Sequence, residues 1–160
     1  MRAPVKPSEA NPLVDTPPPL GHVLEFMRSI WALDHALQKR SKRMKRAQGI
    51  TGPQRLVLRI VGRFPGISAG QLAELLHVHK STLTGVLDRL ERRGLISRRQ
   101  DPQDGRRSFF GLTKSGRAIE TKHEGTVEAT VRKVLSDLPR VQVVTAENVL
   151  RRLTEALEDD

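Results

Sequence analysis

The chain has 160 residues, of which 37% are hydrophobic and only 3% aromatic. This length and composition support one ordinary aliphatic core, or two lobes that share one. The absence of cysteine excludes disulfides, thiolate nucleophiles and cysteine-based zinc or iron–sulfur sites, and it fits a reducing cytosol. No apolar run approaches the roughly 20 residues of a membrane span, and the N-terminus lacks the apolar core of a signal peptide. A cytoplasmic protein without a membrane partner is therefore expected.

The positive charge is concentrated in the middle of the chain. The formal net charge is +10. Residues 80–117 contain ten basic and four acidic residues, whereas residues 118–160 contain six basic and nine acidic residues. A basic segment followed by an acidic one indicates that one face of the protein binds a polyanion.

The N-terminal part is expected to contain an arm and one long helix. Residues 1–19 are rich in proline and poor in periodic apolar residues, which predicts a disordered arm. Apolar residues then recur at three- and four-residue steps from Leu20, and Gly49 is a plausible end for this helix. The helix closes with KRSKRMKR (residues 39–46), six basic residues in eight. Such a run is typical of a solvated helix end, and it is also compatible with contact to a DNA backbone.

Two capping boxes predict helix starts in the middle of the chain. Thr51 with Gln54, and Ser68 with Gln71, have the required spacing, so one helix is expected after each pair. The second of these helices is short. It is followed by a tight turn and by another helix that ends at Gly94, which together form the helix-turn-helix arrangement.

The last helix of this arrangement, residues 80–93, has a face that suits the DNA major groove. Opposite its leucines it carries small hydroxyls and arginines, which can contact base edges or phosphates. A solvated helix face is the alternative explanation. The candidate DNA-binding residues on this helix are Lys80, Ser81, Thr82, Thr84, Gly85, Arg89 and Arg92.

The segment DPQDGRRSFFGLT (residues 101–113) predicts a turn that leads into a strand. With the strand from Leu95 it forms a hairpin, or wing, beside the same DNA. An arginine in the wing would meet the enhanced negative potential of a narrow minor groove. A solvated hairpin is the alternative. The candidate wing residues are Arg106 and Arg107 as DNA contacts, with Asp101 and Asp104 orienting Arg106.

Two further helices, roughly 114–137 and 140–158, are expected on either side of Pro139. Their acidic, apolar-striped composition suits self-association rather than contact with DNA. The expected fold is thus mainly α with a small β-hairpin wing. The expected organisation is a disordered arm (1–19), an N-terminal dimerisation helix (20–49), a winged helix-turn-helix DNA-binding lobe (50–113) and C-terminal dimerisation helices (114–160).

The segment STLTGVLDRLERRGLISRRQDPQDGRRSFFGLTKSG resembles the winged helix-turn-helix core of the MarR family of bacterial transcriptional regulators. The resemblance covers about residues 51–117, with weaker similarity in the flanking helices. It implies an obligate homodimer with interlocking terminal helices and one winged lobe on each half of a palindrome. Many relatives are repressors released by a small anionic or phenolic ligand. The family pattern D-x-x-D-x-R…L-T-x-x-G fits Asp101, Asp104, Arg106, Leu112, Thr113 and Gly116.

Two residues depart from the family's pattern. His79 stands where family members often have a serine that caps the recognition helix, and histidine is a poorer cap. Gly105 stands where a second basic residue is common in the wing, which implies a more flexible tip that binds phosphate less strongly.

Together these features predict a sequence-specific double-stranded DNA-binding regulator, a homodimeric repressor of a palindromic operator. A small aromatic or anionic effector is expected near Trp31, His35 and the winged lobe. No catalytic residue, cofactor or metal site is expected, because the chain has no glycine-rich phosphate loop and no recognisable Ser–His pairing, and its histidines are not spaced as ligands. The alternatives are an architectural, sequence-indifferent nucleic-acid-binding protein and a winged-helix module of a protein assembly.

Overall fold

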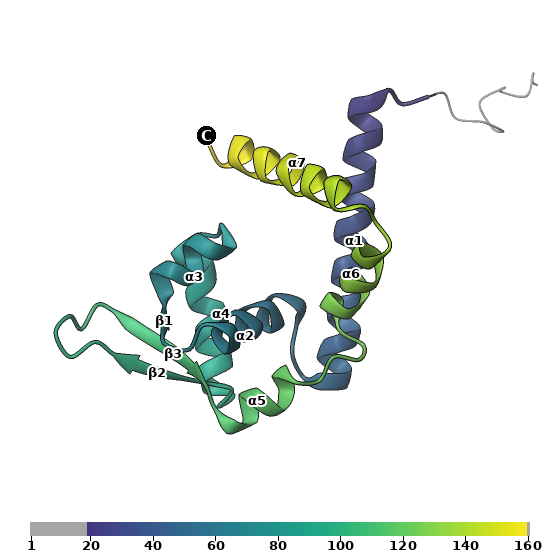
Figure 1. The fold of residues 1–160 in the computed structure, drawn as a ribbon. Coiled ribbons are helices and arrows are strands. Elements are labelled where there is room, and N and C mark those ends of the chain that lie inside the picture. The colour runs from purple at the N-terminus through teal and green to yellow at the C-terminus, as the bar shows by residue number, and fades with distance from the viewer. Residues whose placement is uncertain (1–18, 160) are drawn as a thin grey trace, which may run out of the picture. The chain divides into compact units, whose positions relative to one another are not determined.

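The structure is a computed structural model that describes residues 19–159 (Figure 1). The predicted mainly α fold with a small β component is confirmed. The predicted arm lies outside the described residues, apart from Pro19. The chain divides between His35 and Ala36 into two compact units. The elements are α1 (His22–Gln48), α2 (Gly52–Arg63), β1 (Ile67–Ser68), α3 (Ala69–Leu76), α4 (Lys80–Arg92), β2 (Ile96–Gln100), β3 (Ser108–Leu112), α5 (Lys114–Glu120), α6 (Val127–Ser136) and α7 (Arg140–Glu158).

One aliphatic core stabilises the winged lobe, which we define as residues 50–113. Leu83, Leu87 and Leu90 lie at three- and four-residue steps, so one face of α4 enters this core. The opposite face of α4 is left to solvent. The buried core residues are Ile50, Val57, Leu58, Val61, Ile67, Leu72, Ala73, Leu83, Leu87, Leu90, Leu95, Ile96 and Phe110.

Side-chain caps determine where α2 and α3 begin. The hydroxyl of Thr51 accepts the N–H of Gln54, whose side-chain oxygen accepts the N–H of Thr51 (3.0 Å). Ser68 and Gln71 form the same reciprocal pair. Both predicted capping boxes are therefore confirmed. α4 begins differently, because its N-cap residue His79 makes no side-chain cap hydrogen bond.

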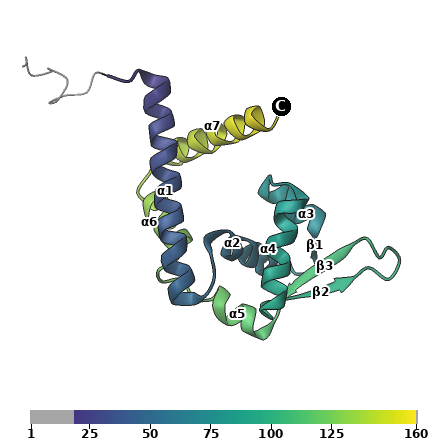
Figure 2. The ribbon, with the colours of Figure 1, turned by 180° about the vertical axis from the view of Figure 1, so that it is seen from behind.

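A three-stranded antiparallel sheet of order β1–β3–β2 completes the lobe. β2 and β3 pair from Ile96–Leu112 to Gln100–Ser108, which leaves residues 101–107 as the hairpin loop. The predicted wing is therefore present, and both views of the ribbon show its loop projecting beyond the helices of the lobe (Figures 1 and 2). The two-residue strand β1 was not predicted from the sequence.

The L-T-x-x-G run joins the wing to α5. The hydroxyl of Thr113 accepts the N–H of Gly116 (3.0 Å) and donates to the carbonyl of Gly94 (2.6 Å). A Cβ on Gly116 would lie 1.9 Å from the carbonyl oxygen of Leu95, so only glycine permits this close approach. The run thus fixes the base of the wing against the turn that follows α4.

The single helix predicted over residues 114–137 is wrong, because the structure contains two helices, α5 and α6, in this segment. Gly125 has a φ of 73°, in the left-handed region that favours glycine. The hydroxyl of Thr126 then accepts the N–H of Ala129 (3.2 Å) and caps α6. Apolar residues on both sides of the break keep a helical spacing, so the apolar periodicity predicts one continuous helix where the structure has two.

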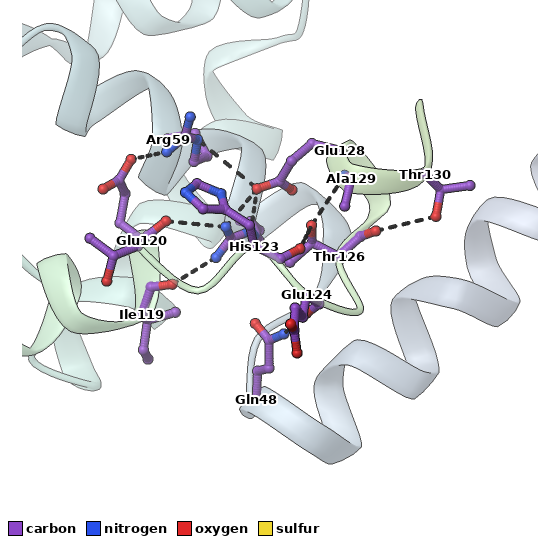
Figure 3. A network of polar contacts seen from close by, with 12 residues as sticks. Gln48, Arg59, Ile119, Glu120, His123, Glu124, Thr126, Glu128, Ala129 and Thr130 are labelled. Carbon is purple, nitrogen blue, oxygen red and sulfur yellow. Dashed lines mark hydrogen bonds and ion pairs between the residues drawn. The ribbon is translucent and has the colours of Figure 1, made fainter. Parts of the chain in front are cut away.

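A buried arginine holds α2 against the connection between α5 and α6. The side chain of Arg55 is only 1% exposed, and its guanidinium donates to Glu128 Oε1 (2.6 Å). It also donates to the carbonyl oxygens of Ile119 (2.8 Å) and Glu120 (3.2 Å). Arg59, one turn further along α2, pairs with the Glu120 carboxylate (Figure 3). Charge-assisted hydrogen bonds therefore link the winged lobe to the start of α6.

The electrostatics of this network favour an ionised Glu128. Burial alone would raise the pKa of Glu128, but its hydrogen bond to Arg55 and the charges of Arg55 and Arg59 together lower the pKa below its ordinary value. The carboxylate is thus stabilised in the form that pairs with the buried guanidinium.

Apolar side chains remain exposed along the terminal helices. α6 and α7 contain no buried residue, and Met44 is the one buried residue of α1. Trp31 and Leu157 are each 79% exposed. None of the described helices has the length and apolar character needed to cross a membrane. Exposed apolar stripes of this extent mark association surfaces.

Candidate nucleic-acid interface

α3 and α4 meet through a tight turn at His77–His79. His77 adopts a left-handed conformation (φ 48°, ψ 51°) that ends α3, and its N–H bonds to the carbonyls of Ala73 and Glu74. Val78 then donates its N–H to the Ala73 carbonyl (3.2 Å). Two helices joined in this way form the predicted helix-turn-helix, with α4 in the position of the recognition helix.

The exposed face of α4 carries six of the seven predicted helix contacts; the seventh, Gly85, is half-buried. The Thr84 hydroxyl donates to the Lys80 carbonyl (2.7 Å), so its oxygen lone pairs remain free to accept from a ligand. A Cβ on Gly85 would lie 3.5 Å from Arg89 Nη2, so the Arg89 side chain folds back over the glycine. The exposed contacts are Lys80, Ser81, Thr82, Thr84, Arg89 and Arg92.

Two aspartates shape the wing loop through backbone hydrogen bonds. Asp101 Oδ1 accepts the N–H of Gln103 (2.9 Å), and Asp104 Oδ1 accepts the N–H of Arg106 (3.0 Å). The loop is closed by hydrogen bonds from the Asp101 N–H to the Arg107 carbonyl and from the Arg107 N–H to the Asp104 carbonyl, both 2.9 Å. Short polar side chains that bond two residues ahead are typical turn formers.

The Arg106 side chain is exposed, and within residues 19–159 it takes part in no ion pair. Asp104 therefore contacts Arg106 through the backbone N–H of that residue and not through its guanidinium, and the Asp101 carboxylate bonds to Gln103 instead. That Arg106 and Arg107 contact DNA stays a prediction. The exposed position of both side chains at the loop is compatible with it.

Arg98 of β2 joins the wing to the recognition helix. Its guanidinium pairs with Asp88 Oδ1 (2.6 Å) and Glu91 Oε2 (2.9 Å), both on α4. It also lies 5.3 Å from the centroid of the Phe110 ring on β3, a cation–π geometry. These contacts tie the hairpin to α4 and so hold the wing beside the recognition helix.

The sequence reasoning missed this role of Arg98. Asp88 and Glu91 are three residues apart and share a face of α4, which was an available signal for a cationic partner. Their partner could not be chosen between Arg98 and Arg99, because strand alternation does not say which face meets the helix.

The candidate effector residues lie apart from this surface in the chain. Trp31 and His35 are four residues apart on α1, so they share one helix face, and both are exposed. They belong to the unit that ends at His35, whereas α4 and the wing belong to the unit that begins at Ala36.

A helix-turn-helix whose second helix has a basic, hydroxyl-rich face and is clamped to a β-hairpin defines a winged helix-turn-helix DNA-binding protein. The sequence profile of the MarR family matches residues 50–108. The homoprotocatechuate degradative operon repressor of Escherichia coli is 30% identical over 110 residues, which cover 69% of this chain and 70% of that protein. The chain therefore belongs to the MarR family.

A second relative matches a shorter segment. The transcriptional regulator HosA of Escherichia coli O111:H- is 43% identical over 70 residues, which cover 44% of this chain and about half (52%) of HosA.

Solved structures share the fold over most of the chain. FabT of Streptococcus pneumoniae in complex with DNA has a TM-score of 0.58 and 27% identity, over 86% of this chain and 96% of that chain. The PcaV transcriptional regulator of Streptomyces coelicolor in complex with its natural ligand has a TM-score of 0.61 and 26% identity, over 94% and 99%. These neighbours include both a DNA-bound and a ligand-bound protein.

Proposed function

We propose that this protein is a homodimeric transcriptional repressor that binds a palindromic double-stranded DNA operator and is released by a small-molecule ligand. The observation that supports the proposal is the clamp at Arg98, whose ion pairs hold the basic recognition helix α4 beside the basic wing. Helix-turn-helix dimers place two such helices about one turn of DNA apart, roughly 34 Å. The operator should therefore be an inverted repeat.

Selection of bound fragments from genomic or random DNA with the purified protein, followed by footprinting, tests this function. We expect a protected inverted repeat that survives competition by excess random duplex, with a preference of about 10³ or more. Equal binding to all duplexes would instead support the alternative, an architectural, sequence-indifferent DNA-binding protein.

The proposed effector is a small aromatic or anionic molecule bound at Trp31 and His35. A related repressor takes its name from the homoprotocatechuate degradative operon, and a neighbour was solved with its natural ligand. Release requires that the ligand binds the DNA-incompetent state more tightly, since equal affinity shifts nothing. Titration of aromatic acids, followed by Trp31 fluorescence and by operator affinity, tests the proposal. If no acid alters operator affinity, the protein binds DNA constitutively.

The organisation follows from this function. Residues 20–49 and 114–160 would serve as dimerisation helices and residues 50–113 as the DNA-binding lobe. As a cytoplasmic DNA-binding regulator, the protein would have no catalytic activity of its own.

A further inference from the structure

Four cations surround one pocket at the C-terminal ends of α1 and α4. The pocket has a volume of about 540 Å³, a size that suits a small ligand group. Lys45 comes from α1, and Arg89, Arg92 and Arg93 come from the end of α4. The remaining lining residues, Gly49 and Gln54, are neutral. We call this feature the four-cation pocket.

In the described part of the chain, no carboxylate forms an ion pair with a residue of the four-cation pocket. Among residues 19–159, none of the ion pairs includes Lys45, Arg89, Arg92 or Arg93. The acids nearest in sequence, Asp88 and Glu91, are both engaged by Arg98. The clamp that joins the wing to α4 therefore engages the two carboxylates of α4, and neither of them pairs with an arginine of α4.

Two of the four cations are held in place by neutral acceptors. Arg93 Nη1 donates to the Gly49 carbonyl, and Arg92 Nε donates to the Asp88 carbonyl (3.2 Å). A carbonyl at a helix end orients a guanidinium and interacts with its charge, but it does not cancel that charge. The positive charges therefore stay concentrated around one open surface pocket.

The basic run of residues 39–46 extends the same positive region along α1. Its members Lys39, Lys42, Arg43 and Arg46 are exposed and, within the described part of the chain, form no ion pair. Like charges held close together repel one another, and a bound anion relieves that repulsion. Guanidinium groups match both carboxylate and phosphate oxygens with paired N–H donors, and a phosphate group offers more oxygens and can carry more negative charge, so it suits a set of four cations better.

We propose that the four-cation pocket is a phosphate-binding site. The phosphate comes either from the backbone of operator DNA, since Arg89 and Arg92 belong to the recognition helix, or from a free phosphate-bearing molecule. The DNA source rests on the proposed function, whereas the free source does not. In this proposal Lys45, at the basic end of α1, contacts phosphate and is not simply a solvated side chain.

Lys45→Gln tests the site, with Lys122→Gln as its matched control. Both substitutions remove one exposed lysine, but Lys122 lies outside the basic run and only Lys45 lines the pocket. In the first arm, operator affinity is measured at several salt concentrations. If DNA supplies the phosphate, Lys45→Gln weakens binding and reduces the slope of log affinity against log salt by about one, and Lys122→Gln changes the slope much less.

In the second arm, inorganic phosphate and pyrophosphate are titrated against the full chain in calorimetry, with chloride at equal ionic strength as reference. If the source is free phosphate, the wild type binds, Lys45→Gln binds several-fold more weakly, and Lys122→Gln behaves as the wild type. Equal behaviour of both variants in both arms overturns the site. Failure of the wild type to prefer an operator over random duplex overturns the proposed function, while the second arm still decides the pocket.

Discussion

The winged lobe and the terminal helices α6 and α7 differ in how far their apolar residues are buried. In the lobe, leucines, valines and isoleucines from three helices and the sheet are almost completely buried within a single chain. Along α6 and α7 not one residue is buried, and Val141 and Leu157 are 70% and 79% exposed. The lobe therefore has a core of its own, whereas we propose that a second copy of the chain covers the apolar faces of the terminal helices.

The largest expected effect, on dimer affinity, follows from disrupting the exposed apolar face of α7. Leu150→Asp places a charge on the apolar face of α7, where burial of an unpaired carboxylate costs about 3 kcal/mol or more. The dimer dissociation constant should rise at least about 100-fold, since each 1.4 kcal/mol is a factor of ten. Light scattering measures the change, and operator binding should fall with it.

Asn148→Asp is the matched control, because it adds the same charge two residues away on a different face of α7. The Asn148 side chain already accepts from Arg151 Nη2 (3.4 Å), and an aspartate can keep that contact. If Leu150→Asp stays dimeric, or if both variants dissociate alike, α7 is not the dimerisation surface.

Loss of the Arg55 network, which links the winged lobe to the start of α6, should give the next largest effect, a decrease in the free energy of unfolding. Arg55→Met removes the buried guanidinium, and with it the hydrogen bonds that it donates to the Glu128 carboxylate and to two carbonyl oxygens. Loss of one member of a buried pair costs about 3–5 kcal/mol of unfolding free energy. Denaturant unfolding measures this loss. A loss below about 1 kcal/mol would mean that water replaces the guanidinium and that the network does not hold α2 against α6.

The pairing of Glu128 with Arg55 also predicts that the free energy of unfolding depends on pH. Because the pKa of Glu128 is lower in the folded chain than in the unfolded chain, its ionisation stabilises the fold above the ordinary glutamate pKa of about 4.3. That contribution disappears as the pH falls through the lower, folded-state pKa. Glu128→Gln should therefore be less stable than the wild type at pH 7, and the gap should close in acid. Glu124→Gln, at an exposed glutamate of the same connection, should show no such gap.

The contrast between the regions also explains how far the sequence could be interpreted. Capping boxes and leucine spacing located α2, α3 and α4, because both signals are local and most of the apolar residues at these helical spacings enter the core of the lobe. The break before α6 depends on Gly125 and on the buried hydroxyl of Thr126, and neither interrupts the apolar spacing. The clamp at Arg98 and the buried Arg55 are contacts between elements distant in sequence, so no local pattern could select them.

Within the winged lobe, the clamp should matter more for DNA binding than for stability. Arg98→Gln removes two partly exposed ion pairs and a cation–π contact, together about 1–2 kcal/mol. Arg99→Gln removes the same charge from the neighbouring residue, which has no ion pair in the described chain. Hydrogen exchange of the amides in residues 101–107 should be faster in Arg98→Gln alone, and its operator affinity should fall further. Equal exchange rates in both variants would show that Arg98 does not hold the wing against α4.

The smallest effect concerns Asp104, where charge and hydrogen bonding act in opposite directions. Removing a carboxylate near DNA phosphates should strengthen binding, whereas losing the hydrogen bond to the Arg106 N–H should weaken it, because the loop must then be ordered on binding at about 0.5–1.5 kcal/mol. Asp104→Asn removes the charge and keeps an acceptor, but Asp104→Ala removes both. We expect Asp104→Asn to bind operator slightly more tightly than the wild type, and Asp104→Ala to bind up to about tenfold more weakly than Asp104→Asn. Measured at several salt concentrations, the difference between the two variants should persist at high salt, since it reflects loop order and not charge. If asparagine and alanine give the same affinity, Asp104 acts on DNA through its charge alone and the backbone of Arg106 is positioned by the hairpin itself.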